Sequence, residues 1–535
     1  MLKQLPTDGF RRMHLGALWL SVVMLPWSEF GLSVAQLLLL GNWLVEGIVR
    51  RDLVGRFKRA LTTPASAVWL SFFGLHLLGL LWTTDLEWGV DLCRILLPVL
   101  GMGLVLSSVP RLAARELRSL LLFGAWSTAA SALVCLLLQH DVIRQGQYRE
   151  LSIFISHIRL ALMLCLSIAV FVALWPKRLW QRAAHVLAIA WCVFFLDRLS
   201  SLLSFGILAV LAIGAAVRWA RGQRPVVRAG AWSVIVLALL ALGLYARWCV
   251  WSYTQVEPVD LAQLDQRSAG GELYYHDPRG SQHENGHPVW IDVADKELAR
   301  GWSHLSRVPF DSLDAQGQPL RWTLVHYLAS LGVRKDSVGL RALSAADVQR
   351  IELGMTNVNE GRRDPLRARI DQVLFELEEY RRTGDPSGHS VTMRLEFLRT
   401  GWSIARAHWA FGVGTGDTQA AFDQAYVDTG SPLASIWRLR AHNEYLTLLI
   451  SFGAFGLAWS LFSWWWPAWR NQAFRQPLFI AWGIIFLISC LSEDTIETQM
   501  GATFFALYYT LFVFAAPPIA PAITGAAAPA PARSA

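Results

Sequence analysis

The sequence predicts an all-α integral membrane protein with about twelve transmembrane helices and one large, mainly helical extracytoplasmic loop domain. Three observations lead to this prediction. The 535 residues are 54% hydrophobic and only 16% charged, whereas soluble domains carry about 25% charged residues. Apolar stretches long enough to cross a hydrocarbon core of about 30 Å recur along the chain. Short basic or polar connectors separate them, and a single long polar block interrupts them.

We expect a helix in each apolar stretch, because backbone polar groups inside a bilayer must be satisfied within their own segment. The expected ranges are 13–28, 30–49, 67–83, 88–108, 117–139, 157–175, 183–197, 199–219, 231–249, 442–463, 478–492 and 500–516. An even number of spans would place both chain termini on one side of the membrane.

The side follows from the positions of Lys and Arg, since basic connectors stay in the cytoplasm. The connectors 83–89 and 492–499 are poor in basic residues. The opposite set is rich in arginine, at 50–59, 111–118, 177–182, 218–228 and 470–475. Both termini are therefore expected in the cytoplasm. The net charge of +8 results from this asymmetry and gives no reason to invoke nucleic acid.

The chain divides into four expected parts. They are a bundle of about nine spans at 1–249, a loop domain at 250–440, about three further spans at 441–516, and an Ala- and Pro-rich cytoplasmic tail at 517–535 that should be disordered.

Inside the loop, Pro365 begins an expected helix with an apolar stripe. Ser344 and Asp347 form the pattern of a capping box. The stretch 266–290 is glycine-rich and should be irregular. No motif assigns a role to residues 255–390.

The stretch HNEYLTLLISFGAFG at 442–456 is the most informative. A helix through it would place His442 on the same face as Gly453 and Gly456. Glycines on that face allow a neighbouring helix to approach closely, so the face should point into the bundle. His442 would then point inward at the extracytoplasmic boundary. A boundary histidine that merely snorkels to water is the alternative.

A second stretch, 393–417, closes the loop domain. As a helix over 393–409, it would place Arg394 on an apolar face, where a cation needs an anionic partner. Arg394 is therefore a candidate for ligand contact, and a salt bridge within the loop domain is the alternative. The following GVGTG at 412–416 has the wrong spacing for a dinucleotide fingerprint and should be a tight turn.

Two further arginines, Arg159 and Arg198, lie at expected extracytoplasmic helix ends. Charged residues at such depth usually face a bundle interior or a water-filled cavity. For Arg198 the alternative is a pair with Asp197, although adjacent residues on a helix point apart. The acidic loop with Glu493, Asp494 and Glu497 would either neutralise the arginines or hold an acceptor.

Two other patterns argue against metal and disulfide chemistry. HENGH at 283–287 has the HExxH pattern of zinc hydrolases, but Gly286 and Pro288 disfavour the helix that this site needs. The six cysteines lie in or beside apolar stretches without metal-ligand spacing, so no disulfide framework is expected.

Together these features resemble the O-antigen ligase and O-antigen polymerase family of membrane glycosyltransferases. The resemblance is carried by HN-x9-G-x2-G at 442–456, by Arg394 before GVGTGD, and by Arg198 after a mid-chain span. It implies a multi-pass protein of the bacterial inner membrane, with its large loop in the periplasm, that participates in lipopolysaccharide biosynthesis. The donor would be a glycan on undecaprenyl diphosphate, and the acceptor a hydroxyl of lipid A-core, with no nucleotide, metal or other cofactor.

The resemblance implies His442 as general base and Arg198 and Arg394 as a diphosphate clamp, to which we add Arg159. The expected supporting residues are Asn443, Gly453, Gly456, Glu493 and Asp494. The assignment agrees with the chemistry, because no nucleotide pool exists outside the inner membrane and the donor must arrive activated. Arginine stabilises charge on a diphosphate leaving group, and histidine accepts a proton near neutral pH. We expect inversion at the anomeric carbon.

Three alternatives remain open at this stage. A polymerase would use a second lipid-linked repeat as acceptor, and a protein O-oligosaccharyltransferase would use a protein hydroxyl. A polysaccharide transporter also suits the number of spans. Transporters, however, typically place ionisable groups near the bilayer midplane within repeated halves, whereas these candidates gather at one membrane face.

Overall fold

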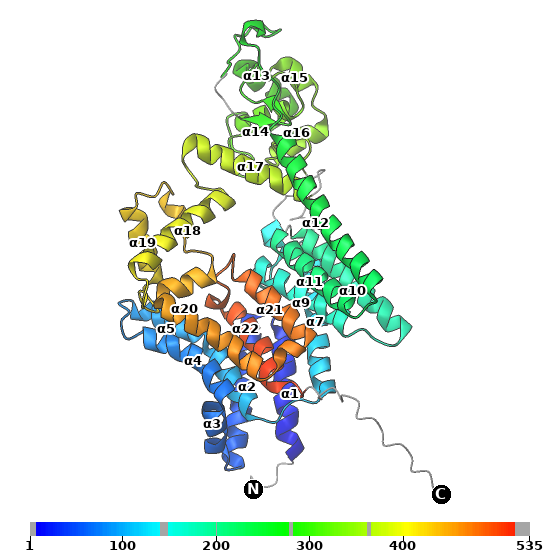
Figure 1. Cartoon of the computed structure of the whole chain (residues 1–535). Helices are drawn as coiled ribbons and strands as arrows, with labels where there is room; N and C mark the ends of the chain where they lie inside the picture. The colour runs from blue at the N-terminus through cyan, green and yellow to red at the C-terminus, as the bar shows by residue number, and fades with distance from the viewer. Residues whose placement is uncertain (1–6, 140–147, 200, 278–281, 361–364, 519–535) are drawn as a thin grey trace. The chain divides into compact units, whose positions relative to one another are not determined.

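The computed structural model describes residues 7–139, 148–199, 201–277, 282–360 and 365–518. Each expected transmembrane range contains a helix (Figure 1). These helices are α1 (Thr7–Met24), α2 (Glu29–Val49), α4 (Pro64–Gly79), α5 (Leu86–Ile95), α6 (Leu97–Ser108), α7 (Ala114–Leu138), α9 (His157–Ala173), α10 (Leu179–Arg198), α11 (Leu202–Arg221), α12 (Pro225–Tyr253), α20 (Glu444–Arg470), α21 (Pro477–Ser489) and α22 (Gln499–Thr510). An all-α membrane protein is confirmed.

Fewer helices than the predicted twelve or so have the length and hydropathy of a complete membrane span. Within the described residues, 7 helical segments are long and apolar enough to cross a membrane, or up to 8 if a bent pair is one span. Three shorter apolar helical segments, His157–Ala173, Pro477–Ser489 and Gln499–Ala515, were also expected as spans. The structure therefore establishes several membrane-crossing helices, and a count of about twelve stays a prediction.

Breaks inside the apolar stretches have local causes. The expected helix 67–83 begins at Pro64 and is bent by 85° from α3 (Leu53–Thr62). The expected helix 88–108 divides at Leu96, because Pro98 in the first turn of α6 cannot donate a backbone hydrogen bond. The last helix continues into a short π-helix, Leu511–Ala515.

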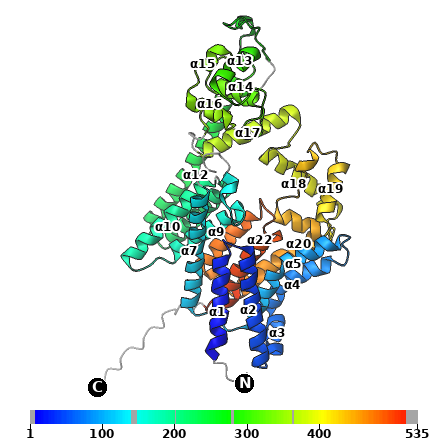
Figure 2. The same ribbon diagram turned by 180° about the vertical axis from the view of Figure 1, so that it is seen from behind.

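The chain forms two compact units. Unit 1 comprises 1–215 and 393–535, and unit 2 comprises 216–392. In unit 1, α1 packs beside α2 and α20 packs along α4 (Figure 2). Unit 1 also contains α18 (Ser390–Ala407) from Met393 onward, and α19 (Thr418–Asp428). A separate cluster of buried side chains, including Phe397, Phe422 and Ile450, joins α18 and α19 to the start of α20.

Unit 2 contains the long α12 and a small helical core. Its helices after α12 are α13 (Asp295–Leu305), α14 (Leu320–Ser330), α15 (Ser337–Arg341), α16 (Ala345–Glu352) and α17 (Pro365–Thr383). Side chains of α13 and α14, among them Trp302 and Tyr327, are fully buried at its centre. The regular secondary structure of the expected loop is thus mainly helical, as predicted, and irregular connections join its helices. The capping box of Ser344 and Asp347 begins α16, and α17 begins at Pro365.

The HENGH stretch is a hairpin of two short antiparallel strands, β1 (His283–Glu284) and β2 (His287–Pro288). Asn285 and Gly286 between them have φ of 52° and 90°, as a tight hairpin turn requires. The stretch 266–290 was expected to be irregular, but its end has regular secondary structure, because an Asn-Gly pair favours a hairpin turn. The expected disordered tail lies outside the described residues from position 519 onward.

Candidate functional site

The site begins at the N-terminus of α20. Asn443 is the N-cap, and its side-chain oxygen accepts a hydrogen bond from the backbone N–H of Leu446. His442 therefore lies just before the helix, with a φ of 47°. The expectation that His442 shares a helical face with Gly453 and Gly456 is wrong, because a capping residue separates the histidine from the helix.

One carboxylate lies between the two main candidate residues. Glu493 Oε1 is 3.6 Å from Nη2 of Arg394, and Glu493 Oε2 is 4.0 Å from Nδ1 of His442. The side chains of Arg394 and His442 are 47% and 34% exposed, whereas Glu493 is only 13% exposed. The distances exceed those of hydrogen bonds. Glu493 is near enough to attract the Arg394 guanidinium, and to attract the His442 imidazole when that ring is protonated. The partner of Arg394 thus lies in the acidic loop and not in the loop domain.

The loop that carries Glu493 is fixed to the first turn of α20. The side-chain amide of Asn443 donates to the carbonyl of Leu491 at 3.0 Å, and its backbone N–H donates to Asp494 at 3.1 Å. The hydroxyl of Thr447 donates to the same Asp494 oxygen at 2.8 Å. Asn443 and Asp494 therefore hold the backbone on both sides of Glu493 in a defined position.

Arg159 contributes from behind this loop. It is buried, with 7% exposure, at the start of α9, and its Nη2 donates to the backbone carbonyl of Asp494 at 3.4 Å. Its Nη1 has no hydrogen-bond partner among the described residues. Because the guanidinium is buried, its interaction is with the backbone of the loop and not with solvent.

Arg198 lies apart from this group. Its guanidinium pairs with Asp197 at 2.6 Å and lies 5.3 Å from the ring centre of Phe194. The alternative partner considered from the sequence is thus present, because the side chains at the end of α10 are long enough to meet. Ion pairs and hydrogen bonds connect one group of residues: His442, Arg394, Glu493, Asn443, Asp494 and Arg159. Among the described residues, no such contact links Arg198 to this group.

Two charged residues near the site, Glu444 and Arg440, carry no motif that singles them out in the sequence. Glu444 is buried in the first turn of α20 and accepts a hydrogen bond from the backbone N–H of Ile496 at 3.0 Å. Arg440 forms an ion pair with Glu497 and lies 5.7 Å from the ring centre of Trp88. The sequence does contain a signal for Glu444: it is an acidic residue directly after the His-Asn pair, in the first turn of a helix, where the helix dipole favours negative charge.

The ionisation of Glu497 is perturbed. Burial raises the pKa of Glu497 to about 7, although the nearby Arg440 opposes the shift. Asp494 adds to the shift because like charges repel. This carboxyl therefore changes charge close to neutral pH.

The GVGTG turn packs directly on α20. Gly453 has φ 66° and ψ −172°, which breaks the helix and frees carbonyl groups upstream. The backbone N–H groups of Val413 and Gly414 donate to the carbonyls of Ile450 and Ser451, both at 2.9 Å. The expected turn is present as a bend, with φ of 70° at Gly412 and 105° at Gly414, and its backbone N–H groups bond to other elements rather than within the turn.

The close approach predicted for Gly453 comes from the backbone just before this turn rather than from a helix, since a Cβ on Gly453 would stand 2.1 Å from the carbonyl carbon of Ala410. At Gly456 an added Cβ would stand 2.1 Å from the Cβ of Phe452 in the same helix and 3.7 Å from Leu75 of α4.

The turn is also tied to the α4–α5 connector. The carboxylate of Asp417 accepts hydrogen bonds from Thr83 and from the backbone N–H groups of Thr84 and Asp85, at 2.8 to 2.9 Å. Burial would raise the pKa of Asp417, but these donors outweigh it and lower the pKa. The segment between Arg394 and His442 is therefore held by two neighbouring elements of unit 1.

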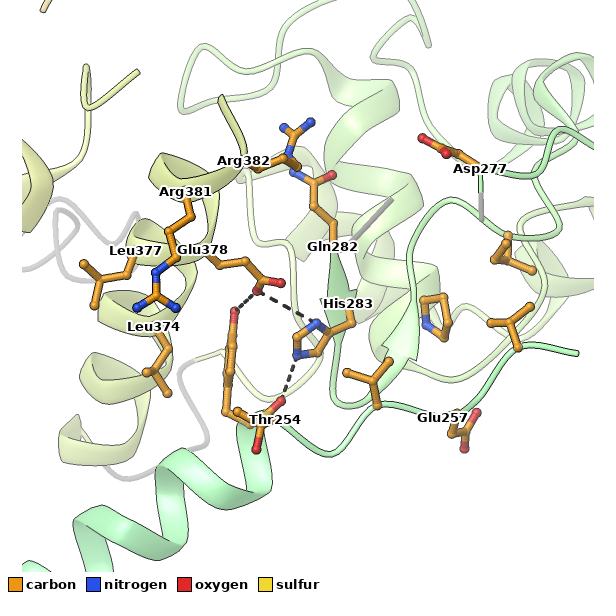
Figure 3. A pocket seen from close by; sticks show the side chains of 15 residues that line it. Thr254, Glu257, Asp277, Gln282, His283, Leu374, Leu377, Glu378, Arg381 and Arg382 are labelled. Atoms are coloured by element: carbon orange, nitrogen blue, oxygen red, sulfur yellow. Dashed lines mark hydrogen bonds and ion pairs between the residues drawn. The ribbon is translucent and has the colours of Figure 1, made fainter. Parts of the chain in front are cut away.

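Unit 2 contains a separate pocket of about 880 Å³ between the end of α12, the β hairpin and α17 (Figure 3). Glu378 accepts a hydrogen bond from the Tyr253 hydroxyl at 3.1 Å, and His283 contacts the Tyr253 carbonyl at 2.8 Å. None of the sequence-predicted site residues lines this pocket. Its central polar groups are engaged with one another.

The fold and the site define a multi-pass α-helical membrane protein with an imidazole and a guanidinium held at the start of one apolar helix. Residues 342–460 match the family model described as O-antigen ligase. The match confirms the resemblance to this family and includes Arg394, the GVGTG turn, His442 and both glycines of α20. It supports a function of the O-antigen ligase or polymerase type. No curated protein sequence gives a match to this chain.

Proposed function

We propose that this chain is an O-antigen ligase-type glycosyltransferase of the bacterial inner membrane. It moves a glycan from undecaprenyl diphosphate to an acceptor hydroxyl of lipid A-core at the periplasmic face. The observation that carries the proposal is the position of Glu493 between His442 and Arg394. A base and a cation held by one carboxylate suit a reaction in which a proton is removed while negative charge grows on a leaving group.

In this proposal the Nε2 atom of His442 takes the proton of the acceptor hydroxyl. The acceptor oxygen attacks the anomeric carbon, and the bond from that carbon to the diphosphate oxygen breaks. The electron pair leaves with the diphosphate, whose charge is stabilised by Arg394. Glu493 stabilises the imidazolium that forms, as an acidic partner does for other histidine bases.

The other arginines have different roles. Arg159 is a positioning residue, because its contact is with the backbone of Asp494. Arg198 is a second candidate for diphosphate binding, and its pair with Asp197 must open before it binds. Glu493 is mostly buried and paired, which favours an orienting role over a nucleophilic one. We therefore expect inversion at the anomeric carbon, and a trapped glycosyl-enzyme adduct would contradict it.

The decisive experiment is transfer in vitro from a purified lipid-linked glycan. We expect His442→Ala to lower kcat by about 10²–10⁴-fold, the usual contribution of a general base. Arg394→Ala should cost about 10²–10³-fold, as for other groups that stabilise developing negative charge. Arg394→Lys is the matched control, because it keeps the charge and should retain part of the activity. Full activity in both alanine variants would refute the site.

The acceptor is tested separately in a strain that lacks this protein. A ligase predicts long, unligated polymer on the lipid carrier. Accumulation of single repeat units on the carrier would instead identify a polymerase. Loss of glycosylated protein with intact lipopolysaccharide would point to protein O-glycosylation.

A further inference from the structure

The helix that carries Arg394 has two different faces. Its buried face, with Phe397 and Ile404, packs on α19 and α20. On the opposite face Leu395, Leu398 and Trp402 are 49%, 38% and 49% exposed. At about 100° per residue, these three side chains form one stripe along α18. A helix face in water is normally polar, so this stripe requires an apolar partner.

Two exposed arginines lie at one edge of this stripe. Arg399 is 3.6 Å from Glu396 of the preceding turn, and Arg406 lies 5.5 Å from the ring centre of Trp402. No acidic residue occupies the stripe itself. An apolar face of leucine and tryptophan with arginines along its polar edge is typical of helices that lie in the interface between lipid headgroups and acyl chains.

The stripe continues onto a membrane-crossing helix. The rings of Trp409 and Phe411 lie 6.3 Å and 5.8 Å from the ring of Phe455 on α20, and all three are exposed. Further along α20, Trp459 and Phe462 are exposed as well. Because α20 is long and apolar enough to cross a membrane, we expect its exposed rings to face lipid. The same lipid is the partner that fits the outer face of α18.

We propose that the outer face of α18 lies in the extracytoplasmic headgroup layer of the membrane. Leu395, Leu398 and Trp402 enter the boundary with the acyl chains, and Arg399 and Arg406 bind phosphate groups of phospholipids. The proposal does not depend on catalysis. Combined with the proposed function, it places Arg394 at the depth at which the diphosphate of a lipid-linked donor lies.

Spin-label accessibility in lipid nanodiscs tests the position of α18 in the full-length protein. Labels are attached at Leu398→Cys and Trp402→Cys, with Gln424→Cys on the exposed side of α19 as the control. The native cysteines do not interfere, since all six are buried. We expect collisions with a water-soluble nickel complex to fall several-fold at 398 and 402 relative to 424, and collisions with oxygen to rise.

Three outcomes decide the matter. Low nickel and high oxygen accessibility at 398 and 402 supports the proposal. Accessibility to nickel equal to that at 424 would mean that water covers the face, and protection from both reagents would mean that protein covers it. Either result overturns the proposal. Leu395→Cys gives an independent position if one of the other variants does not fold.

The role of the arginines is tested by charge reversal. Arg399→Glu combined with Arg406→Glu should raise nickel accessibility of the label at 402, because a carboxylate repels lipid phosphate. Arg399→Lys combined with Arg406→Lys keeps both charges and should leave the label immersed. Equal immersion in the reversed and the conservative variants would refute phosphate binding by these two residues.

Discussion

At the scale of single residues, Glu493 is the group that makes His442 and Arg394 one site. The N-cap of α20 and the hydrogen bonds of Asp494 fix the backbone beside it. A carboxylate in that position has a low entropic cost of ordering, because its loop is already held. The Coulombic attraction to both neighbours is therefore available when charge forms during the reaction.

Replacing this carboxylate tests its role. We expect Glu493→Gln to lower kcat by about tenfold to a hundredfold, since the imidazolium loses its countercharge at about 4 Å. The effect on kcat should exceed that on KM, as measured in the transfer assay with saturating donor. Asp423→Asn, on the exposed side of α19, is the control. An unchanged kcat in Glu493→Gln would exclude this electrostatic role.

Glu497 gives a prediction about pH. Its folded-state pKa of about 7 lies above the unfolded value, so the folded protein binds more protons between the two values. Stability should therefore be highest below about pH 4.5 for this group and fall as the pH rises towards 7.

The measurement is the thermal midpoint from tryptophan fluorescence in detergent. Between pH 5 and 8 the loss of stability should be smaller in Glu497→Gln than in the parent protein. A parallel decrease in both proteins would show that Glu497 does not cause it.

At the scale of elements, the break in α20 is the feature that organises the site. Gly453 adopts a conformation that only glycine accepts readily, and the freed carbonyls bind the GVGTG turn. Through these hydrogen bonds the GVGTG turn also holds the segment between α18 and α20 in place. A regular helix through position 453 would remove these contacts.

Gly453→Ala should therefore destabilise the protein by more than about 2 kcal/mol, because it combines backbone strain with a collision against the backbone at Ala410. Gly483→Ala in α21 is the matched control, since no atom lies within 4 Å of an added Cβ there. It should be neutral or stabilising by up to about 1 kcal/mol. Thermal unfolding of the two variants measures the difference, and equal midpoints would contradict the role of the break.

At the scale of the whole molecule, the topology remains the prediction with the widest consequences. The proposed chemistry requires the segment 250–440 on the periplasmic side, where lipid-linked glycans are presented. The arginine-rich connectors assign that side by charge alone.

Labelling of intact cells with a membrane-impermeant thiol reagent checks this assignment. Ala315→Cys, in an exposed turn of unit 2, should react from outside, whereas Arg224→Cys should react only after permeabilisation. The buried native cysteines should stay unlabelled in both cases. The reverse labelling pattern would show that the protein has the opposite orientation in the membrane. That orientation would exclude the proposed function.

Local sequence signals predicted much of the fold. Apolar runs located the helices, Pro365 and the Ser344 capping box located helix starts, and glycines located the GVGTG turn. These features succeed because hydrophobic length, capping and turn conformation depend on residues close in sequence. The break at Leu96 and the bend before α4 were missed, since a helix interruption inside a continuous apolar run leaves little change in hydropathy.

The sequence by itself determined that the chain enters the membrane many times and that His442, Arg394 and an acidic loop are its candidate reactive groups. Only the tertiary structure decided which of them meet. Glu493 joins His442 to Arg394 across a long separation in the chain, Arg159 supports their loop, and Arg198 pairs with Asp197 instead. Such pairings depend on how helices pack, and packing is set by side chains distant in sequence rather than by the local pattern around each residue.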